Sequence, residues 1–133
     1  MKPEIPVGTV FTKEMVVKEE HLATTFGSGR VKVFSTPYMI AFVEGTCNEG
    51  MMGDHDDTHA SVGAVVNINH LRPTPLGMKV RCEAVYMGQD EKNLYTFEAK
   101  VFDEKELVGT CLHKRGFIHI EKFTSKAYSK KAE

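Results

Sequence analysis

The chain has 133 residues, of which 41% are hydrophobic and 26% are charged, and 17 Lys+Arg against 18 Asp+Glu give a formal net charge of −1. This length suits a single domain over residues 1–133 with a core that needs no disulfide or metal. The near-neutral charge argues against nucleic acid as a partner, and no apolar run approaches the roughly 18 residues that a membrane span requires.

The cysteines and the first residues predict a cytoplasmic protein. Three cysteines, at positions 47, 82 and 111, make an odd number without a CxxC pair. This pattern is typical of reduced thiols and not of a disulfide framework. The start of the chain, MKPEIPVGTVF, lacks the charged and then apolar order of a signal peptide.

The first third of the chain predicts a strand, a loop and a helix. Residues 7–17 have the pattern of an extended segment, and residues 18–35 that of a loop that moves. Thr36 suits the N-cap of the following helix, since Pro37 then takes the first helical position. We expect this helix to run to about residue 52, wrapped by other elements because its first turns are apolar on every side.

From residue 60 onward the hydrophobic pattern changes to period two, which is typical of strands. Further strands are predicted over residues 78–87, 95–101 and 107–120, and residues 124–133 are expected to form a flexible tail. An α+β fold follows, in which a curled antiparallel sheet wraps one helix. One face of the first of these strands is predicted to carry Val62, Ala64, Val66, Ile68 and His70.

Glu44 is the charged residue whose position calls for an explanation. At 100° per residue it falls within an apolar stripe of the helix, where burial of a carboxylate costs several kcal/mol unless the group is paired or protonated. Two readings stay open: a carboxylate held for reaction, or one that is partly exposed or paired for structural reasons. The stripe consists of Ile40, Val43, Cys47 and Met51.

His70 and Thr36 are the other candidates for chemistry. His70 shares a strand face with apolar residues, where a histidine is more often a satisfied core residue, but a buried Glu and a buried His together make an acid–base couple. Thr36 has an ordinary role as a cap, yet a hydroxyl at a helix N-terminus also lies beside free N–H groups that favour negative charge.

Three further features carry weaker signals. Gly63, inside a strand, marks either a bulge or a close approach of a ligand to the backbone. Arg115 suits a buried ion pair better than a contact to a phosphorylated ligand. The polar segment 54–59 matches no metal-site spacing, so we expect no metal.

Five short stretches of the chain are informative together: VFSTPYMIAFVE (33–44), VGA (62–64), NHLRPTPLG (69–77), GTCLHKR (109–115) and IHIEKF (118–123). In this order and at these separations, they resemble the hotdog-fold thioesterases related to fluoroacetyl-CoA thioesterase. The resemblance implies an antiparallel sheet around a long helix, and a homodimer with joined sheets and active sites between subunits. It also implies that Thr36, Glu44 and His70 act together on an acyl-CoA thioester, with the backbone N–H of Gly63 near its carbonyl. An arginine matching Arg115 also recurs in such sequences.

We therefore expect an acyl-CoA thioesterase without metal or added cofactor, since coenzyme A is part of the substrate. Glu44 would be the nucleophile or the general base. The family's lid carries phenylalanines, whereas residues 25–30 read TFGSGR, so an acyl group other than fluoroacetyl is expected. Tetramers of two dimers stay open, as do two rival functions: a hotdog hydratase or dehydratase, and a non-catalytic acyl-CoA-binding dimer.

Overall fold

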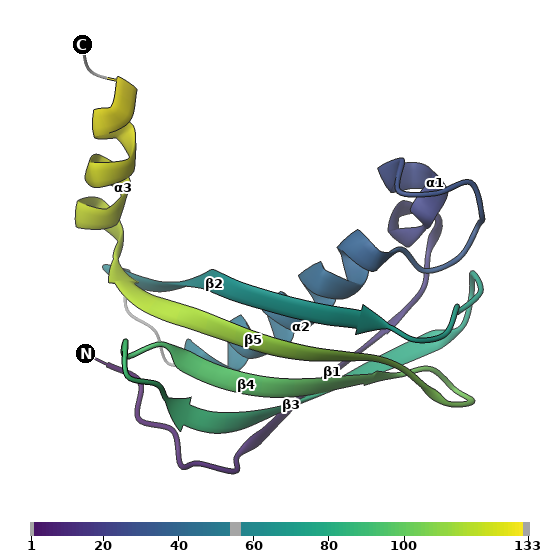
Figure 1. Cartoon of the computed structure of the whole chain (residues 1–133), viewed down its shortest axis with the longest axis horizontal. Helices are drawn as coiled ribbons and strands as arrows, with labels where there is room; N and C mark the ends of the chain where they lie inside the picture. The colour runs from purple at the N-terminus through teal and green to yellow at the C-terminus, as the bar shows by residue number, and fades with distance from the viewer. Residues whose placement is uncertain (1, 54–56, 132–133) are drawn as a thin grey trace.

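One antiparallel sheet and one long helix form the body of the domain (Figure 1). The computed structural model describes residues 2–53 and 57–131. The sheet has five strands in the order β1-β3-β4-β5-β2, and the helix contacts all of them. The expected α+β fold is confirmed. The helix is α2 (Thr36–Met51), and the strands are β1 (Val10–Val16), β2 (His59–His70), β3 (Lys79–Gln89), β4 (Tyr95–Phe102) and β5 (Leu107–His119).

Helix α2 begins as the sequence predicts, but its cap is one residue earlier. Ser35 is the N-cap, and its hydroxyl accepts a hydrogen bond from the backbone N–H of Tyr38 at 3.1 Å. Thr36 is therefore the first helical residue, and the expectation that it caps the helix is wrong. The correction matters because the Thr36 hydroxyl is free to bond elsewhere.

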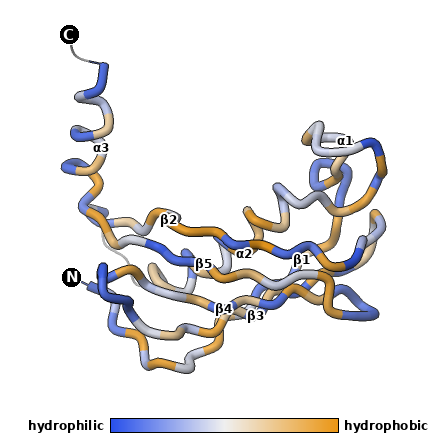
Figure 2. Tube along the Cα trace, viewed as in Figure 1, coloured by the Kyte–Doolittle hydropathy of each residue, from blue (hydrophilic) through white to orange (hydrophobic). Residues whose placement is uncertain are grey.

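The core lies between α2 and the inward face of the sheet. Figure 2 shows hydrophobic residues both along the strands and along α2, which lies against the sheet. From α2 the buried residues include Met39, Phe42 and Val43, which pack against alternate residues of the central strands. Alternation places every second strand residue inward, so the neighbouring polar residues face solvent. The inward residues of β3 and β4 are Val80, Cys82, Ala84, Tyr86, Tyr95, Phe97, Ala99 and Val101.

Strand β2 lies at one edge of the sheet and contains a bulge. Its register with β5 shifts between Gly63, which pairs with Arg115, and Val65, which pairs with Lys114. The extra residue changes which side chains face the helix, because a slip of one residue reverses every later side chain. The uniform face predicted from Val62 to His70 is therefore wrong: its second half faces α2, whereas before the bulge Ser61 and Gly63 do.

The two segments expected to be irregular contain short helices. Within residues 18–35 lie the 3-10 turn η1 (Glu19–His21) and the single helical turn α1 (Ala23–Phe26). At the other end, helix α3 (Ile120–Tyr128) and the turn η2 (Ser129–Lys131) occupy most of the expected tail, and all their residues are exposed or half-buried. Among the described residues, no helix is long and apolar enough to cross a membrane.

Candidate active site

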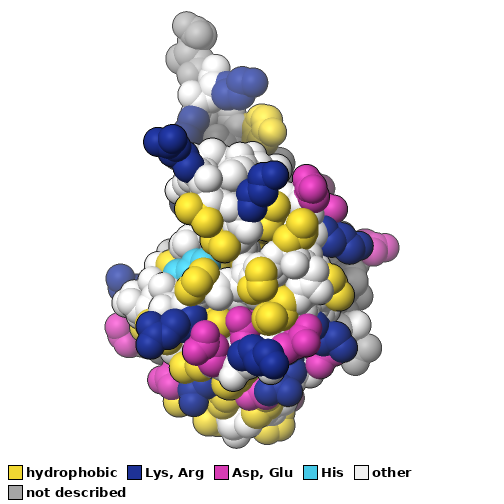
Figure 3. All heavy atoms as spheres, turned by 90° about the vertical axis from the view of Figure 1, so that its right-hand side faces the viewer, with side chains coloured by type: hydrophobic (Ala, Val, Ile, Leu, Met, Phe, Trp, Pro, Cys, Tyr) yellow, Lys and Arg dark blue, Asp and Glu magenta, His cyan; other side chains and the backbone are white. Residues whose placement is uncertain are grey.

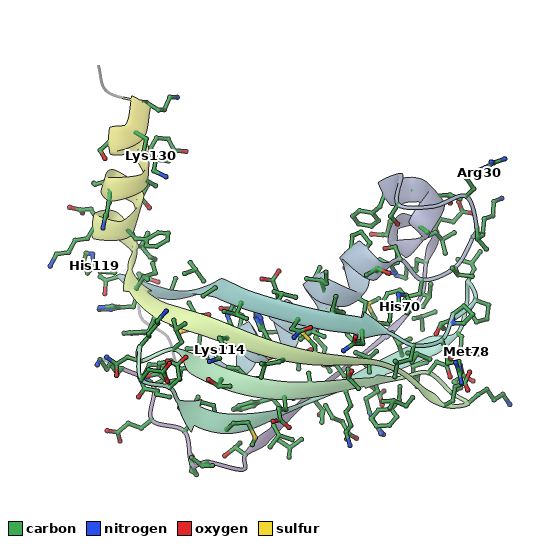
Figure 4. All side chains as sticks on the ribbon, in the orientation of Figure 1. Arg30, His70, Met78, Lys114, His119 and Lys130 are labelled. Carbon is green, nitrogen blue, oxygen red and sulfur yellow. The ribbon has the colours of Figure 1, made fainter. Side chains whose placement is uncertain are left out.

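The N-terminus of α2 and the end of β2 bring Thr36 and His70 together. Thr36 Oγ1 and His70 Nδ1 are 2.7 Å apart, and Figure 4 labels His70 beside the first turns of α2. The ring's other nitrogen, Nε2, is buried and has no hydrogen-bond partner among the described residues. Burial lowers the pKa of His70, so the ring is neutral near pH 7 and presents an unused nitrogen.

Aromatic side chains surround this pair. The ring of Phe34 lies edge-on to that of His70, with centroids 6.5 Å apart, and Tyr38 packs on His21 at 4.2 Å and near Phe26 at 6.0 Å. Figure 3 shows hydrophobic side chains and a histidine exposed on the end of the molecule that carries α1. The segment before α2 therefore contributes apolar surface next to the Thr36–His70 pair.

Glu44, two turns further along α2, belongs to a second cluster. Its half-exposed carboxylate lies opposite the buried guanidinium of Arg115, with Oε2 and Nη1 3.7 Å apart. A Cβ atom on Gly63 would collide with Glu44 Oε2, so the missing side chain makes room for the carboxylate. Gly63 thus lies at the bulge, which was one of its two predicted roles, and the group next to its backbone within the chain is the Glu44 side chain.

Arg115 is held in this cluster by Ser61 and His113. Its Nε donates to Ser61 Oγ at 2.8 Å and its Nη2 donates to Ser61 O at 3.0 Å. Its Nη1 lies 3.1 Å from His113 Nε2. Neither Ser61 nor His113 stands out as a site residue in the sequence. For His113 the sequence does contain a signal, because it is two residues before Arg115 and so lies on the same face of the strand.

Within one chain the two clusters stay apart. Glu44 is eight residues after Thr36, which is about 12 Å along a helix axis. No hydrogen bond or ion pair joins Glu44 to Thr36 or His70 between the residues that the structure describes. The structure thus joins Thr36 with His70, and Glu44 with Arg115 and Gly63.

The remaining candidates do not form a reactive centre in the described part of the chain. Burial raises the pKa of the Cys47 thiol and that of the Cys111 thiol, which keeps both protonated near pH 7. Residues 54–56 of the polar segment 54–59 lie outside the described residues. No group of three or more possible metal ligands occurs among the residues that are described.

Comparison with known proteins places this arrangement in a family. The model of the FlK family, described as fluoroacetyl-CoA-specific thioesterase, matches residues 17–121. A fluoroacetyl-CoA thioesterase of Streptantibioticus cattleyicolor is 28% identical over 137 aligned residues, which cover 98% of this chain and 97% of the relative.

Solved structures show the same fold. The fluoroacetyl-CoA thioesterase FlK superposes with a TM-score of 0.88 at 24% identity, over 96% of this chain and 98% of that one. A thioesterase superfamily member from Thermus thermophilus gives a TM-score of 0.85 at 22% identity, over 96% and 94% of the two chains. A hot-dog-like protein from Thermanaerovibrio acidaminovorans also gives 0.85, at 20% identity and the same coverage. The chain belongs to the family of fluoroacetyl-CoA-specific thioesterases and is an acyl-CoA thioesterase with the hotdog fold.

Proposed function

We propose that this enzyme hydrolyses its acyl-CoA thioester with Glu44, His70 and Thr36, using neither a metal nor an added cofactor. The observation that carries the proposal is the pair of complementary clusters. One offers a carboxylate beside a fixed cation and an open glycine backbone. The other offers a neutral imidazole with an unpaired buried nitrogen.

The reaction has two variants that share these groups. In the first, Glu44 takes a proton from water, and the resulting hydroxide attacks the thioester carbonyl carbon. In the second, a Glu44 oxygen attacks that carbon and forms an anhydride, which water then hydrolyses. In both, the C–S bond breaks, and the departing thiolate accepts a hydrogen bond from His70 Nε2–H while His70 Nδ1 accepts from the Thr36 hydroxyl. The thiolate then takes up the proton that Glu44 removed from water in the first variant, or a proton of the water that opens the anhydride in the second. The Gly63 backbone N–H is the candidate donor to the carbonyl oxygen, and one such donor is worth about 3–4 kcal/mol.

A homodimer would unite the two clusters. Strand β2 is an edge strand with exposed Val65 and Val66, and an open apolar edge favours pairing with another strand. A two-fold axis midway between Gly63 and His70 would join two β2 strands antiparallel. Gly63 and Glu44 of one chain would then approach the partner's His70. Active sites between subunits, as the family resemblance implies, follow from this pairing.

The substrate proposed is an acyl-CoA whose acyl group is not fluoroacetyl. A mutant of FlK forms a complex with acetyl-CoA, which supports CoA thioesters as ligands of this fold. In this chain residues 25–30, within the segment before α2, contain two glycines and one phenylalanine, Phe26, and Phe26 is exposed. This surface offers less aromatic cover for a small fluorinated group than a lid with several phenylalanines.

The test is release of free thiol from a panel of acyl-CoAs, including acetyl, fluoroacetyl, branched, aromatic and long-chain thioesters. We expect turnover of at least one non-fluorinated substrate with a higher kcat/KM than fluoroacetyl-CoA. Binding without thiol release from any of them would support the acyl-CoA-binding alternative. Hydration of enoyl-CoA without thiol release would support the hydratase alternative.

Single-turnover hydrolysis in ¹⁸O-water distinguishes the two chemical variants. Direct attack by Glu44 leaves ¹⁸O in the Glu44 carboxylate after water opens the anhydride at the glutamyl carbon, or in the product acid after attack at the acyl carbon. General base catalysis places the label only in the product acid. Mass spectrometry of the peptide that contains Glu44 detects the label, and its presence there would exclude the general base variant.

A further inference from the structure

The contact between Arg115 and Glu44 has an unusual geometry for a partly buried ion pair. The 3.7 Å between Nη1 and Oε2 is within ion-pair range but beyond hydrogen-bond distance. An unrestrained arginine beside a carboxylate usually forms shorter, often bidentate hydrogen bonds. Something in the site must therefore keep the guanidinium back.

Hydrogen bonds on the opposite side of Arg115 provide this restraint. Ser61 accepts from Nε through its hydroxyl and from Nη2 through its carbonyl, while its own hydroxyl donates to Asn48 Oδ1 at 2.6 Å. Ser61 on β2, itself held by Asn48 on α2, thus fixes one side of the guanidinium group. The bulge in β2 places Ser61 on the inward face that makes these contacts possible.

His113 restrains the third nitrogen. Its Nδ1 lies 2.8 Å from the carbonyl oxygen of Val65, and because a carbonyl only accepts, Nδ1 carries the hydrogen. The lone pair of Nε2 then accepts from Arg115 Nη1 at 3.1 Å. Burial lowers the pKa of His113, and the charge of Arg115 adds to this effect, so the ring stays a neutral acceptor near pH 7.

We propose that Ser61 and His113 are positioning residues that hold Arg115 at ion-pair distance from Glu44. This restraint keeps the positive charge next to the carboxylate without occupying its lone pairs, so that both oxygens can meet a water or the thioester. Without it, Arg115 would move onto Glu44, hydrogen-bond its oxygens and weaken it as base or nucleophile. This inference rests on the proposed function of Glu44.

Other ionisable groups near Glu44 do not take over this role. Burial raises the pKa of Cys47 on α2 and of Cys111 on β5, which leaves both thiols uncharged near pH 7. Lys13 on β1 pairs with Glu49. Arg115 is therefore the cation that acts on Glu44, and Ser61 and His113 fix its position.

The test uses Ser61→Ala and His113→Phe, each of which removes one acceptor for Arg115. We expect kcat to fall about 10- to 100-fold in each, since displacement by roughly 1 Å has effects of that size. We also expect the acidic limb of the kcat/KM profile to move to lower pH by about one unit, because a hydrogen-bonded arginine makes a carboxylate harder to protonate. Arg115→Gln, which removes the cation, should move that limb to higher pH.

Two variants serve as controls. Ser61→Thr retains the hydroxyl and should restore most of the activity. Thr46→Ala removes a buried hydroxyl that donates to the Phe42 carbonyl within α2, so it reports the effect of a polar core deletion unrelated to Arg115. Circular dichroism at the assay temperature confirms that each variant is folded.

An acidic limb that stays in place in both Ser61→Ala and His113→Phe would overturn the inference, even if kcat falls as it does in Thr46→Ala. Glu44→Gln in the same assay keeps the two proposals separate. If Glu44→Gln retains wild-type turnover, the proposed function fails. If it is inactive while both restraint variants behave like wild type, only the positioning role fails.

Discussion

The cluster at the N-terminus of α2 and the cluster at its middle have different hydrogen bonds left unmade within one chain. At the N-terminus, Thr36 and His70 form a short hydrogen bond, yet His70 Nε2 is left buried without a partner. Beside the middle of the helix, Arg115 on β5 has three restraining hydrogen bonds. Glu44 on α2, by contrast, is half-exposed, and its carboxylate makes no hydrogen bond to another described residue. Each cluster thus has one group fixed by hydrogen bonds within the chain and one group, His70 Nε2 or the Glu44 carboxylate, without such a bond between described residues.

This difference fits the proposed dimer, in which the clusters would be the two halves of one site. An unpaired buried nitrogen is costly, by about 1–3 kcal/mol, and is retained where a ligand or a partner uses it. The exposed edge of β2 runs alongside both clusters. A single fold therefore pre-organises each half, and association of two chains would be the step that creates a catalytic centre.

The largest expected effect comes from substituting Glu44 and His70 in separate chains and then combining the two variants in one dimer. Glu44→Gln and His70→Ala should each lower kcat by about 10²–10⁴-fold as homodimers, because each removes a group on which the proposed reaction depends. Heterodimers of the two variants, isolated with two different affinity tags, should regain about half of the wild-type kcat per dimer, since one of the two sites then contains both intact groups. These kcat values are measured as thiol release from the acyl-CoA with the highest kcat/KM in the panel.

Absence of recovery in the isolated heterodimer would show that Glu44 and His70 act within the same chain. A heterodimer of Glu44→Gln with wild type provides the reference, because it should retain one intact site in either arrangement. Sedimentation equilibrium of the wild-type protein establishes separately that dimers form at the assay concentration.

The second prediction acts on the Glu44 cluster alone. In Gly63→Ala the new methyl group collides with Glu44 Oε2, so the carboxylate must swing away towards solvent. Only the tip of a half-exposed side chain moves. The free energy of unfolding should therefore decrease by about 1 kcal/mol, the low end of the roughly 1–3 kcal/mol that overpacking typically costs. The kcat should nevertheless fall by about 10²-fold, because the reacting group is displaced. Urea unfolding and thiol release measure the two quantities.

Gly116→Ala is the matched control on the paired strand. A Cβ there would meet Leu94 at an ordinary contact distance of 3.6 Å, so both stability and kcat should stay close to wild type. Equal kcat values for Gly63→Ala and Gly116→Ala would contradict the placement of Glu44 in the catalytic centre.

The sequence predicts the architecture well because the relevant signals are local. The period-two pattern identifies the four strands after residue 60, and Thr36-Pro37 before an apolar run identifies the start of the helix. Glu44 and His70 become candidates for the same reason: each is a polar residue on an otherwise apolar face.

What the sequence does not reveal depends on pairing between distant strands. The bulge at Gly63 exists because of the register with β5, and it reverses the predicted facing of the first half of β2. Only this register brings Ser61 to Arg115, 54 residues later in the chain. No periodicity within β2 contains that information, so the restraint of Arg115 becomes visible only in three dimensions.

The smallest expected effect concerns which hydroxyl caps α2, and it separates stability from activity at the Thr36 end. Ser35→Ala removes a buried cap, which typically costs about 1 kcal/mol, or about 4 °C in Tm for a chain of this size. Thr36→Val keeps the shape of the side chain and the Ser35 cap, so Tm should change less. It removes the partner of His70 Nδ1, however, and kcat should fall while Ser35→Ala stays near wild type at temperatures below its Tm. Thermal unfolding followed by circular dichroism, together with thiol release, gives both readouts. The opposite result, a lower Tm for Thr36→Val and an unchanged one for Ser35→Ala, would return the cap to Thr36 and leave its hydroxyl committed to the helix backbone instead of His70.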